Sequence, residues 1–246
     1  MSATRGPSMP APGFDEKPLA RFAQRVYDLM VLDAWFVLVS LPWWVALVAL
    51  APDVSNAILF AATALSLGPA LTGVLYALPR LDGETAPSTL FRRGLRQGWR
   101  QSLLLWAPVV AVAAFILVDI HLLSQRPEGV GLGWTIAFAA LGIVGAPWAW
   151  LSQAIAAHFS FRTPDVARLA ASYVLIRPLV AVGLLAMSLA LVILTAWTFD
   201  WLLAFLGSII GVVVISLTRP VFSHIESHFL ADGDDPGDAP ADPHAS

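Results

Sequence analysis

Few side chains in this sequence combine the residue type and the spacing that chemistry requires, and Asp33 stands out among them. It lies about one and a half helical turns after Asp28, which places it about 10 Å inside the inner boundary of the membrane. A carboxylate at that depth in lipid is protonated or paired with another group. Asp33 is therefore a candidate proton or cation site, or else a structural polar contact between helices.

Other catalytic and metal-binding patterns are absent from the sequence. His224 and His228 are four residues apart, but Glu226 lies on another face, so the zinc pattern H-E-x-x-H is not present. The chain has no cysteine, no nucleophile elbow and no glycine-rich phosphate loop. We therefore predict that the protein is not an enzyme, and that it has no cofactor and no metal site.

The elements that must position these groups are apolar helices. Hydrophobic residues make up 58% of the 246 residues and charged residues 13%, against about 25% charged in soluble domains. Six stretches of at least 18 residues lack charge: Ala34–Pro52, Val54–Pro79, Gln101–Val118, Gly129–Phe161, Pro178–Phe199 and Trp201–Thr218. About 20 apolar residues span a bilayer as a helix. The sequence predicts an all-α polytopic membrane protein with six transmembrane helices.

The two ends of the chain differ in composition from this membrane domain, which we expect over residues 21–230. Residues 1–20 contain several prolines and no apolar run, and residues 231–246 are mainly Asp, Pro, Gly and Ala. Neither segment can bury enough apolar surface to fold, so both are predicted to be disordered.

The positive charges predict the orientation. Thirteen of the 14 cations fall on one side of the six stretches, and only Arg126 falls on the other. Cytoplasmic loops of membrane proteins carry the excess of Lys and Arg. We expect a multi-pass protein of the bacterial cytoplasmic membrane with both termini in the cytoplasm.

Two short amphipathic helices are expected in the cytoplasmic connections. In the first, over 88–100, one stripe is apolar (Phe91, Leu95, Trp99) and the neighbouring stripe is basic (Arg92, Arg93, Arg96, Arg100). This helix either anchors to anionic lipid or docks a cytoplasmic partner. Gly94 and Gly98 allow it to approach a neighbour closely. The second helix begins at Thr163-Pro164-Asp165.

Prolines interrupt several predicted membrane helices, among them Pro69 and Pro147. An interior proline frees a backbone carbonyl that other groups must satisfy. Gly68-Pro69 therefore predicts a broken helix at a binding cavity or a simple packing kink. Pro69 lies 31 residues before Arg100 and Pro147 lies 30 residues before Arg177. Both units consist of a membrane helix, a short cytoplasmic helix and a second membrane helix, which suggests two parallel hairpins.

The segment Gly68–Leu78, with Phe91, the arginine cluster and Gln101 after it, resembles the YesL-like family of bacterial integral membrane proteins. Ser40-Leu41-Pro42, Arg177-Pro178 and the closing segment Thr218–Phe222 carry the same resemblance. The resemblance covers roughly residues 20–225. Such proteins are often encoded beside carbohydrate ABC importers, which implies an accessory role in sugar uptake and supplies no catalytic residue.

Two functions follow. The first is an accessory protein of a carbohydrate uptake system that contacts ABC permease subunits. The alternative is a transporter or channel for a small solute, proton-coupled through Asp33. Polar residues are sparse within the spans, where we count Asp33, Asn56 and Gln153. This scarcity favours the first function. Lipid is expected as a partner, including anionic lipid at the cytoplasmic face, and nucleic acid is not.

Overall fold

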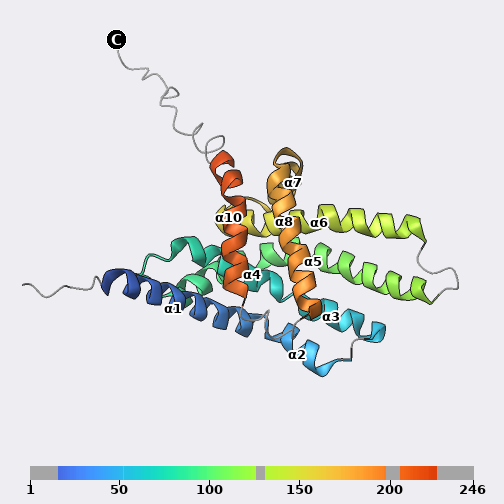
Figure 1. Ribbon diagram of the computed structural model, residues 1–246, viewed down its shortest axis with the longest axis horizontal. Coiled ribbons are helices and arrows are strands. Elements are labelled where there is room, and N and C mark those ends of the chain that lie inside the picture. Colours follow the sequence, from blue (N-terminus) through green and yellow to red (C-terminus); the bar gives the residue numbers. More distant parts are fainter. Residues whose placement is uncertain (1–15, 52, 126–130, 198–205, 226–246) are drawn as a thin grey trace, which may run out of the picture.

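The computed structural model describes residues 16–51, 53–125, 131–197 and 206–225, and within these ranges the chain forms helices and no strand (Figure 1). In chain order the helices are α1 (Glu16–Val39), α2 (Leu41–Ala49), α3 (Ala57–Ala64), α4 (Leu67–Ala77), α5 (Pro87–Ser124), α6 (Leu132–His158), α7 (Thr163–Ile176), α8 (Pro178–Trp197) and α10 (Gly207–Ile225). Two short 3-10 helices, η1 (Val54–Asn56) and η2 (Leu78–Arg80), flank α3 and α4.

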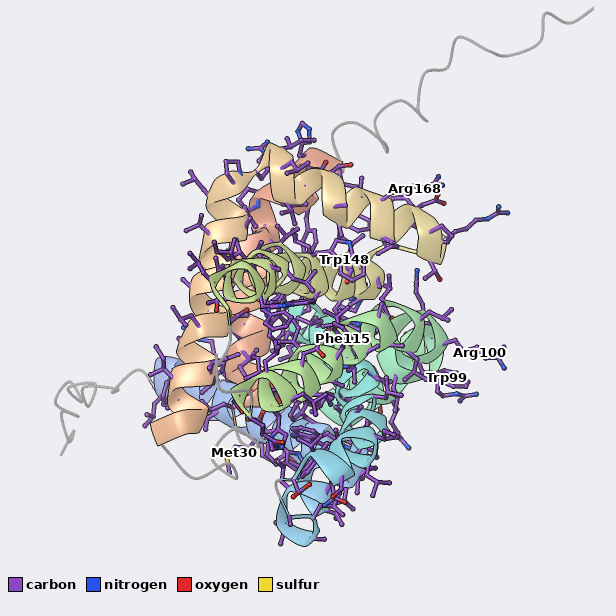
Figure 2. All side chains as sticks on the ribbon, turned by 90° about the vertical axis from the view of Figure 1, so that its right-hand side faces the viewer. Met30, Trp99, Arg100, Phe115, Trp148 and Arg168 are labelled. Atoms are coloured by element: carbon purple, nitrogen blue, oxygen red, sulfur yellow. The ribbon has the colours of Figure 1, made fainter. Side chains whose placement is uncertain are left out.

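Four helical segments are long and apolar enough to cross a membrane, and the number rises to six if each of two bent pairs is one span. The bent pairs are α1 with α2, at 62°, and α7 with α8, at 101°. Large apolar side chains point away from the protein, as Met30 and Phe115 do at 66% and 58% exposure (Figure 2). An apolar exterior suits lipid, so the prediction of an all-α polytopic membrane protein is confirmed.

Helix α4 lies at the centre and packs against α1, α5, α6 and α10. Every residue from Gly68 to Leu75 is buried, because neighbours cover all sides of the helix. Helices α5 and α6 extend side by side away from this centre, and α8 and α10 cross them steeply (Figures 1 and 2).

Glycines bring α4 and α5 into close contact. A Cβ added to Gly94 would lie 2.5 Å from the Cβ of Tyr76, and one added to Gly98 would lie 2.7 Å from the methyl group of Thr72. In the reverse direction, Gly73 of α4 receives the ring of Phe91. The close approach predicted for Gly94 and Gly98 is therefore confirmed.

The predicted interfacial helix over 88–100 is not a separate element. Helix α5 runs without a break from Pro87 to Ser124, so these residues form its first turns. Phe91 is fully buried and its ring stacks on that of Trp35, 5.9 Å between centroids, whereas Trp99 is 44% exposed. The prediction of a separate helix was wrong because α5 continues beyond Arg100, and because the side of these turns that contains Phe91 packs against protein. The second short helix is confirmed as α7.

The second predicted membrane helix, Val54–Pro79, is broken at Leu65 and Ser66, between α3 and α4. The indole nitrogen of Trp106 donates a hydrogen bond to the carbonyl of Ala64 at 3.1 Å, which satisfies a group that the break exposes. Gly68 makes room for the same side chain, since its missing Cβ would lie 2.8 Å from the Cβ of Trp106. Pro69 lies in the first turn of α4, where its missing N–H removes no helical bond. Pro147 lies inside α6, which continues through it.

A tight turn connects η2 to α5. The carboxylate of Asp82 accepts the backbone N–H groups of Thr85, at 3.0 Å, and Glu84, at 2.9 Å, and Gly83 has a φ of 82°. These hydrogen bonds hold the pKa of Asp82 below its ordinary value. The turn fixes the direction in which α5 leaves α4.

The predicted N-terminal boundary needs a correction. Helix α1 begins at Glu16, so residues 16–20, expected to be disordered, are helical. The rest of that segment, residues 1–15, lies outside the described residues, as do His228 and the predicted tail over 231–246.

Candidate functional site

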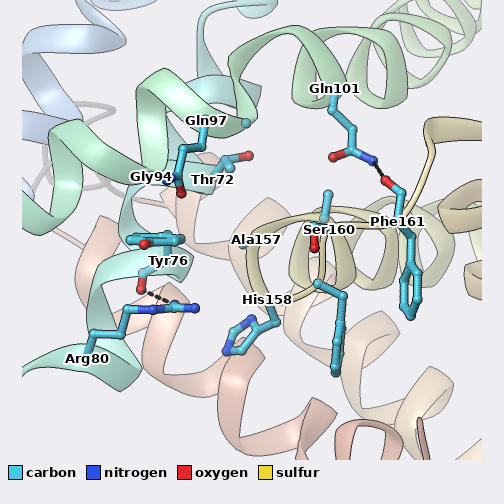
Figure 3. Close-up of a pocket in the computed structure, with 13 residues that line it drawn as sticks. Thr72, Tyr76, Arg80, Gly94, Gln97, Gln101, Ala157, His158, Ser160 and Phe161 are labelled. Atoms are coloured by element: carbon cyan, nitrogen blue, oxygen red, sulfur yellow. Dashed lines mark hydrogen bonds between the residues drawn. The ribbon is translucent and has the colours of Figure 1, made fainter. Parts of the chain in front are cut away.

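A polar cavity of about 410 Å³ opens between three parts of the chain (Figure 3). They are the end of α4 with η2, the first turns of α5, and the end of α6 with the residues after it. The lining residues are Thr72, Tyr76, Arg80, Gly94, Gln97, Gly98, Gln101, Ala156, Ala157, His158, Phe159, Ser160 and Phe161. Its volume falls in the range of about 300–1,000 Å³ that is usual for small-molecule sites. We refer to it as the polar cavity.

Arg80 carries the fixed positive charge of the polar cavity. Its Nη1 donates to the carbonyl of Tyr76 at 2.7 Å, and its guanidinium carbon lies 3.9 Å from the centroid of the Tyr76 ring. These two contacts hold the guanidinium in place. Its remaining N–H groups do not bond to the Tyr76 carbonyl. None of the lining residues is acidic, so the cavity has no carboxylate to neutralise Arg80.

The ring of His158 lies beside the guanidinium of Arg80 at the edge of the polar cavity (Figure 3). Its Nδ1 lies 3.0 Å from the carbonyl oxygen of Ala154. Because a carbonyl only accepts, Nδ1 carries the proton, and Nε2 is the acceptor of the neutral ring. On the far side, Gln101 Nε2 donates to the carbonyl of Phe161 at 2.9 Å, which ties α5 to the segment after α6.

A buried polar cluster of Thr72, Ser102 and Gln153 lies beneath the polar cavity, joined to it through Thr72. The hydroxyls of Thr72 and Ser102 each donate to Gln153 Oε1 at 2.9 Å, and Gln153 Nε2 donates to the Ser102 carbonyl at 3.2 Å. Gln153 and Ser102 are fully buried. The cluster satisfies its own hydrogen bonds and fastens α4, α5 and α6 together.

Asp33 lies away from the polar cavity and contacts the start of α10. It is 8% exposed, and its two carboxylate oxygens accept the backbone N–H of Ser208 at 2.6 Å and the Ser208 hydroxyl at 2.7 Å. The first N–H groups of a helix lack partners within the helix. Asp33 thus caps α10 from another helix, a geometry that favours the structural interpretation of this residue.

The four arginines at the start of α5 form an exposed surface that we call the basic face: Arg92, Arg93, Arg96 and Arg100. The guanidinium of Arg92 lies 5.7 Å from the Trp35 ring and that of Arg100 lies 5.2 Å from the Trp99 ring. Leu95 is half-buried beside them. The basic face lies opposite the glycines that pack on α4, and Arg100 and Trp99 point outward in Figure 2.

No group of three or more metal-ligating side chains occurs among the residues that the structure describes. The ring of His224 packs against that of Tyr173, 5.9 Å between centroids.

Sequence reasoning identified Asp33, the basic face and Gln153, but missed the cavity residues Tyr76, Arg80 and Gln97. Arg80 was counted only as a positive charge. The signal that pointed to it was its position four residues after Tyr76, which places both on one face of a helical turn.

Comparison with known proteins gave no match to a family model, to a curated protein or to a solved structure. The resemblance to the YesL-like family therefore stays a prediction.

Proposed function

We propose that this protein is an accessory protein of a carbohydrate uptake system in the bacterial cytoplasmic membrane, and that it acts by contacting the permease subunits of an ABC importer. Both termini and the basic face lie on the cytoplasmic side in this proposal. The sequence resemblance supplies the link to carbohydrate, and the 13-to-1 distribution of cations supplies the orientation.

The observation that carries the contact role is the basic face. Four arginines are exposed together on the first turns of α5, while the opposite side of the same turns is locked into the protein by Phe91 and Gly94. The face is therefore rigidly presented. Arginines present planar donors that suit carboxylates and lipid phosphates.

The arrangement of polar groups inside the spans supports an accessory role over that of a conduit. The Asp33–Ser208 contact and the buried polar cluster each satisfy their hydrogen bonds internally, so neither offers open donors or acceptors to a passing solute. A sugar path requires several polar groups that face one continuous cavity.

Affinity purification in mild detergent tests the proposal. We expect permease subunits to copurify with the wild-type protein. A variant with Arg92, Arg93, Arg96 and Arg100 replaced by Gln should recover at least about fourfold less, because four exposed charge contacts at about 0.2–1 kcal/mol each sum to about 0.8–4 kcal/mol. Arg168→Gln, an exposed arginine on α7, is the matched control and should recover as much as the wild type. Equal recovery with all three proteins would refute the contact.

The polar cavity favours the alternative, a small-solute transporter, because it is a solute-sized opening that leads to polar groups within the spans. Reconstitution separates the two functions. Uptake of sugar by vesicles that contain this protein alone would establish the transporter, and an absence of uptake is the result expected for an accessory protein.

A further inference from the structure

We propose that the polar cavity is a binding site for a phosphate group, carried either by a small water-soluble phosphate ester or by a lipid headgroup. This inference does not depend on the accessory role, because a protein that contacts no permease would still bind phosphate. It rests on the charge, the donor set and the size of the cavity.

The charge of the polar cavity selects an anion. Arg80 is the cation that lines it, and the lining contains no acidic residue that would compensate the charge. Two contacts already hold the guanidinium against Tyr76, so little side-chain freedom remains to be lost when a ligand binds. A fixed, uncompensated guanidinium in a recessed site is a binding element for an oxyanion.

The donors of the polar cavity fit the shape of a phosphate group. Arg80, Gln97 and Ser160 come from three separate segments and lie around the cavity in Figure 3. A phosphate has three outward-pointing oxygens and accepts hydrogen bonds from several directions, whereas a carboxylate accepts them in one plane. Donors that surround a cavity therefore match phosphate better than carboxylate.

The volume allows more than the phosphate alone. A cavity of about 410 Å³ accommodates a phosphate ester with a small polar body. The remaining lining offers hydrogen-bonding partners for such a body, among them the carboxamide of Gln101 and the ring of His158.

The test uses the full chain in nanodiscs of phosphatidylcholine, with glucose 6-phosphate, inorganic phosphate and glucose as soluble probes. We expect glucose 6-phosphate and inorganic phosphate to raise the melting temperature and glucose to leave it unchanged, if the source is soluble. In a second arm, phosphatidylglycerol replaces part of the phosphatidylcholine. Stabilisation in this arm alone assigns the site to a lipid headgroup.

Variants decide whether the response belongs to the polar cavity. Arg80→Gln should weaken binding of the effective probe at least about tenfold, because charge-assisted hydrogen bonds are lost. Arg168→Gln removes the same charge from α7, outside the cavity, and should bind as the wild type does.

Two results would overturn the inference. One is a wild-type protein that responds to neither phosphate source. The other is equal binding by the Arg80→Gln and Arg168→Gln proteins. If Arg80→Gln does not fold, Gln97→Leu and Ser160→Ala take its place, and each should weaken binding severalfold. Unchanged affinity in both of these folded variants would also reject the site.

Discussion

Replacement of Asp33 tests what holds the start of α10 in place. Asp33→Asn keeps the shape of the side chain and its capacity for two hydrogen bonds. The amide oxygen can accept from the Ser208 N–H, and the amide nitrogen can donate to the Ser208 hydroxyl, which also accepts. Asp33→Leu has a similar size but offers no acceptor to either group.

The contacts at 2.6 and 2.7 Å set the expected magnitudes. We expect Asp33→Asn to change the free energy of unfolding by less than about 1 kcal/mol, since both bonds survive. Asp33→Leu should cost about 1–3 kcal/mol, because the Ser208 N–H lies in the first turn of α10 and has no partner within the helix. Ser208→Ala removes the hydroxyl bond alone and should fall between these two.

The assay is equilibrium unfolding in mixed detergent micelles. Ser216→Ala is the matched control on α10, since its exposed hydroxyl bonds only to the carbonyl of Val212 in its own helix. An Asp33→Leu protein as stable as the wild type, or an Asp33→Asn protein that loses as much stability as Asp33→Leu, would contradict this role of Asp33. An Asp33→Asn protein that is stable but abolishes sugar uptake by cells would make this carboxylate a proton site and favour the transporter.

Three further predictions concern packing and topology. Gly94→Ala should lower the free energy of unfolding by about 1–3 kcal/mol because the new Cβ meets an α4 side chain at 2.5 Å, whereas Gly142→Ala, with open space around it, should not lower it; equal melting temperatures would contradict the close packing. Gln153→Leu should cost about 1–3 kcal/mol by removing the acceptor of two buried hydroxyls, and an unchanged melting temperature would show that they find other partners. A single cysteine at Ser55 should react with an impermeant thiol reagent on intact cells and one at Thr89 should not, and the reverse pattern would refute the proposed orientation.

The helices could be predicted from the sequence because a backbone in lipid must satisfy its own hydrogen bonds. That constraint turns each long uncharged stretch into a helix regardless of its neighbours. Where the chain bends depends on tertiary contacts, and these were harder to predict. The break at Leu65 and Ser66, for instance, is stabilised by Trp106, which belongs to another helix and lies 42 positions after Ala64, whose carbonyl it bonds.

The first turns of α5 show why a periodic pattern does not identify the surface that it contacts. Phe91, Leu95 and Trp99 recur at a spacing that suits either a lipid surface or a protein neighbour. The glycines at 94 and 98 carried the missing information, because close backbone approach requires another helix. Combined, the two signals point to packing on α4 for one side of α5 and an exposed basic face for the other.

The polar cavity could not be predicted from local patterns, because one part of its lining, the end of α6 with the residues after it, is distant in the sequence from the other two parts. Arg80 and Ser160 are 80 positions apart, and neither belongs to a motif. Asp33 was identified by its depth alone, but its partner Ser208 lies 175 residues away and only the fold brings the two together.

Photo-crosslinking from the basic face tests the proposed function most directly. A photo-reactive amino acid replaces Arg96 in one strain and Arg168, on α7, in another, and the proteins are irradiated in living cells. We predict that the probe at 96 crosslinks to a permease subunit of an ABC importer and that the probe at 168 does not. Absence of any permease crosslink from 96, or equal crosslinking from both positions, would contradict it.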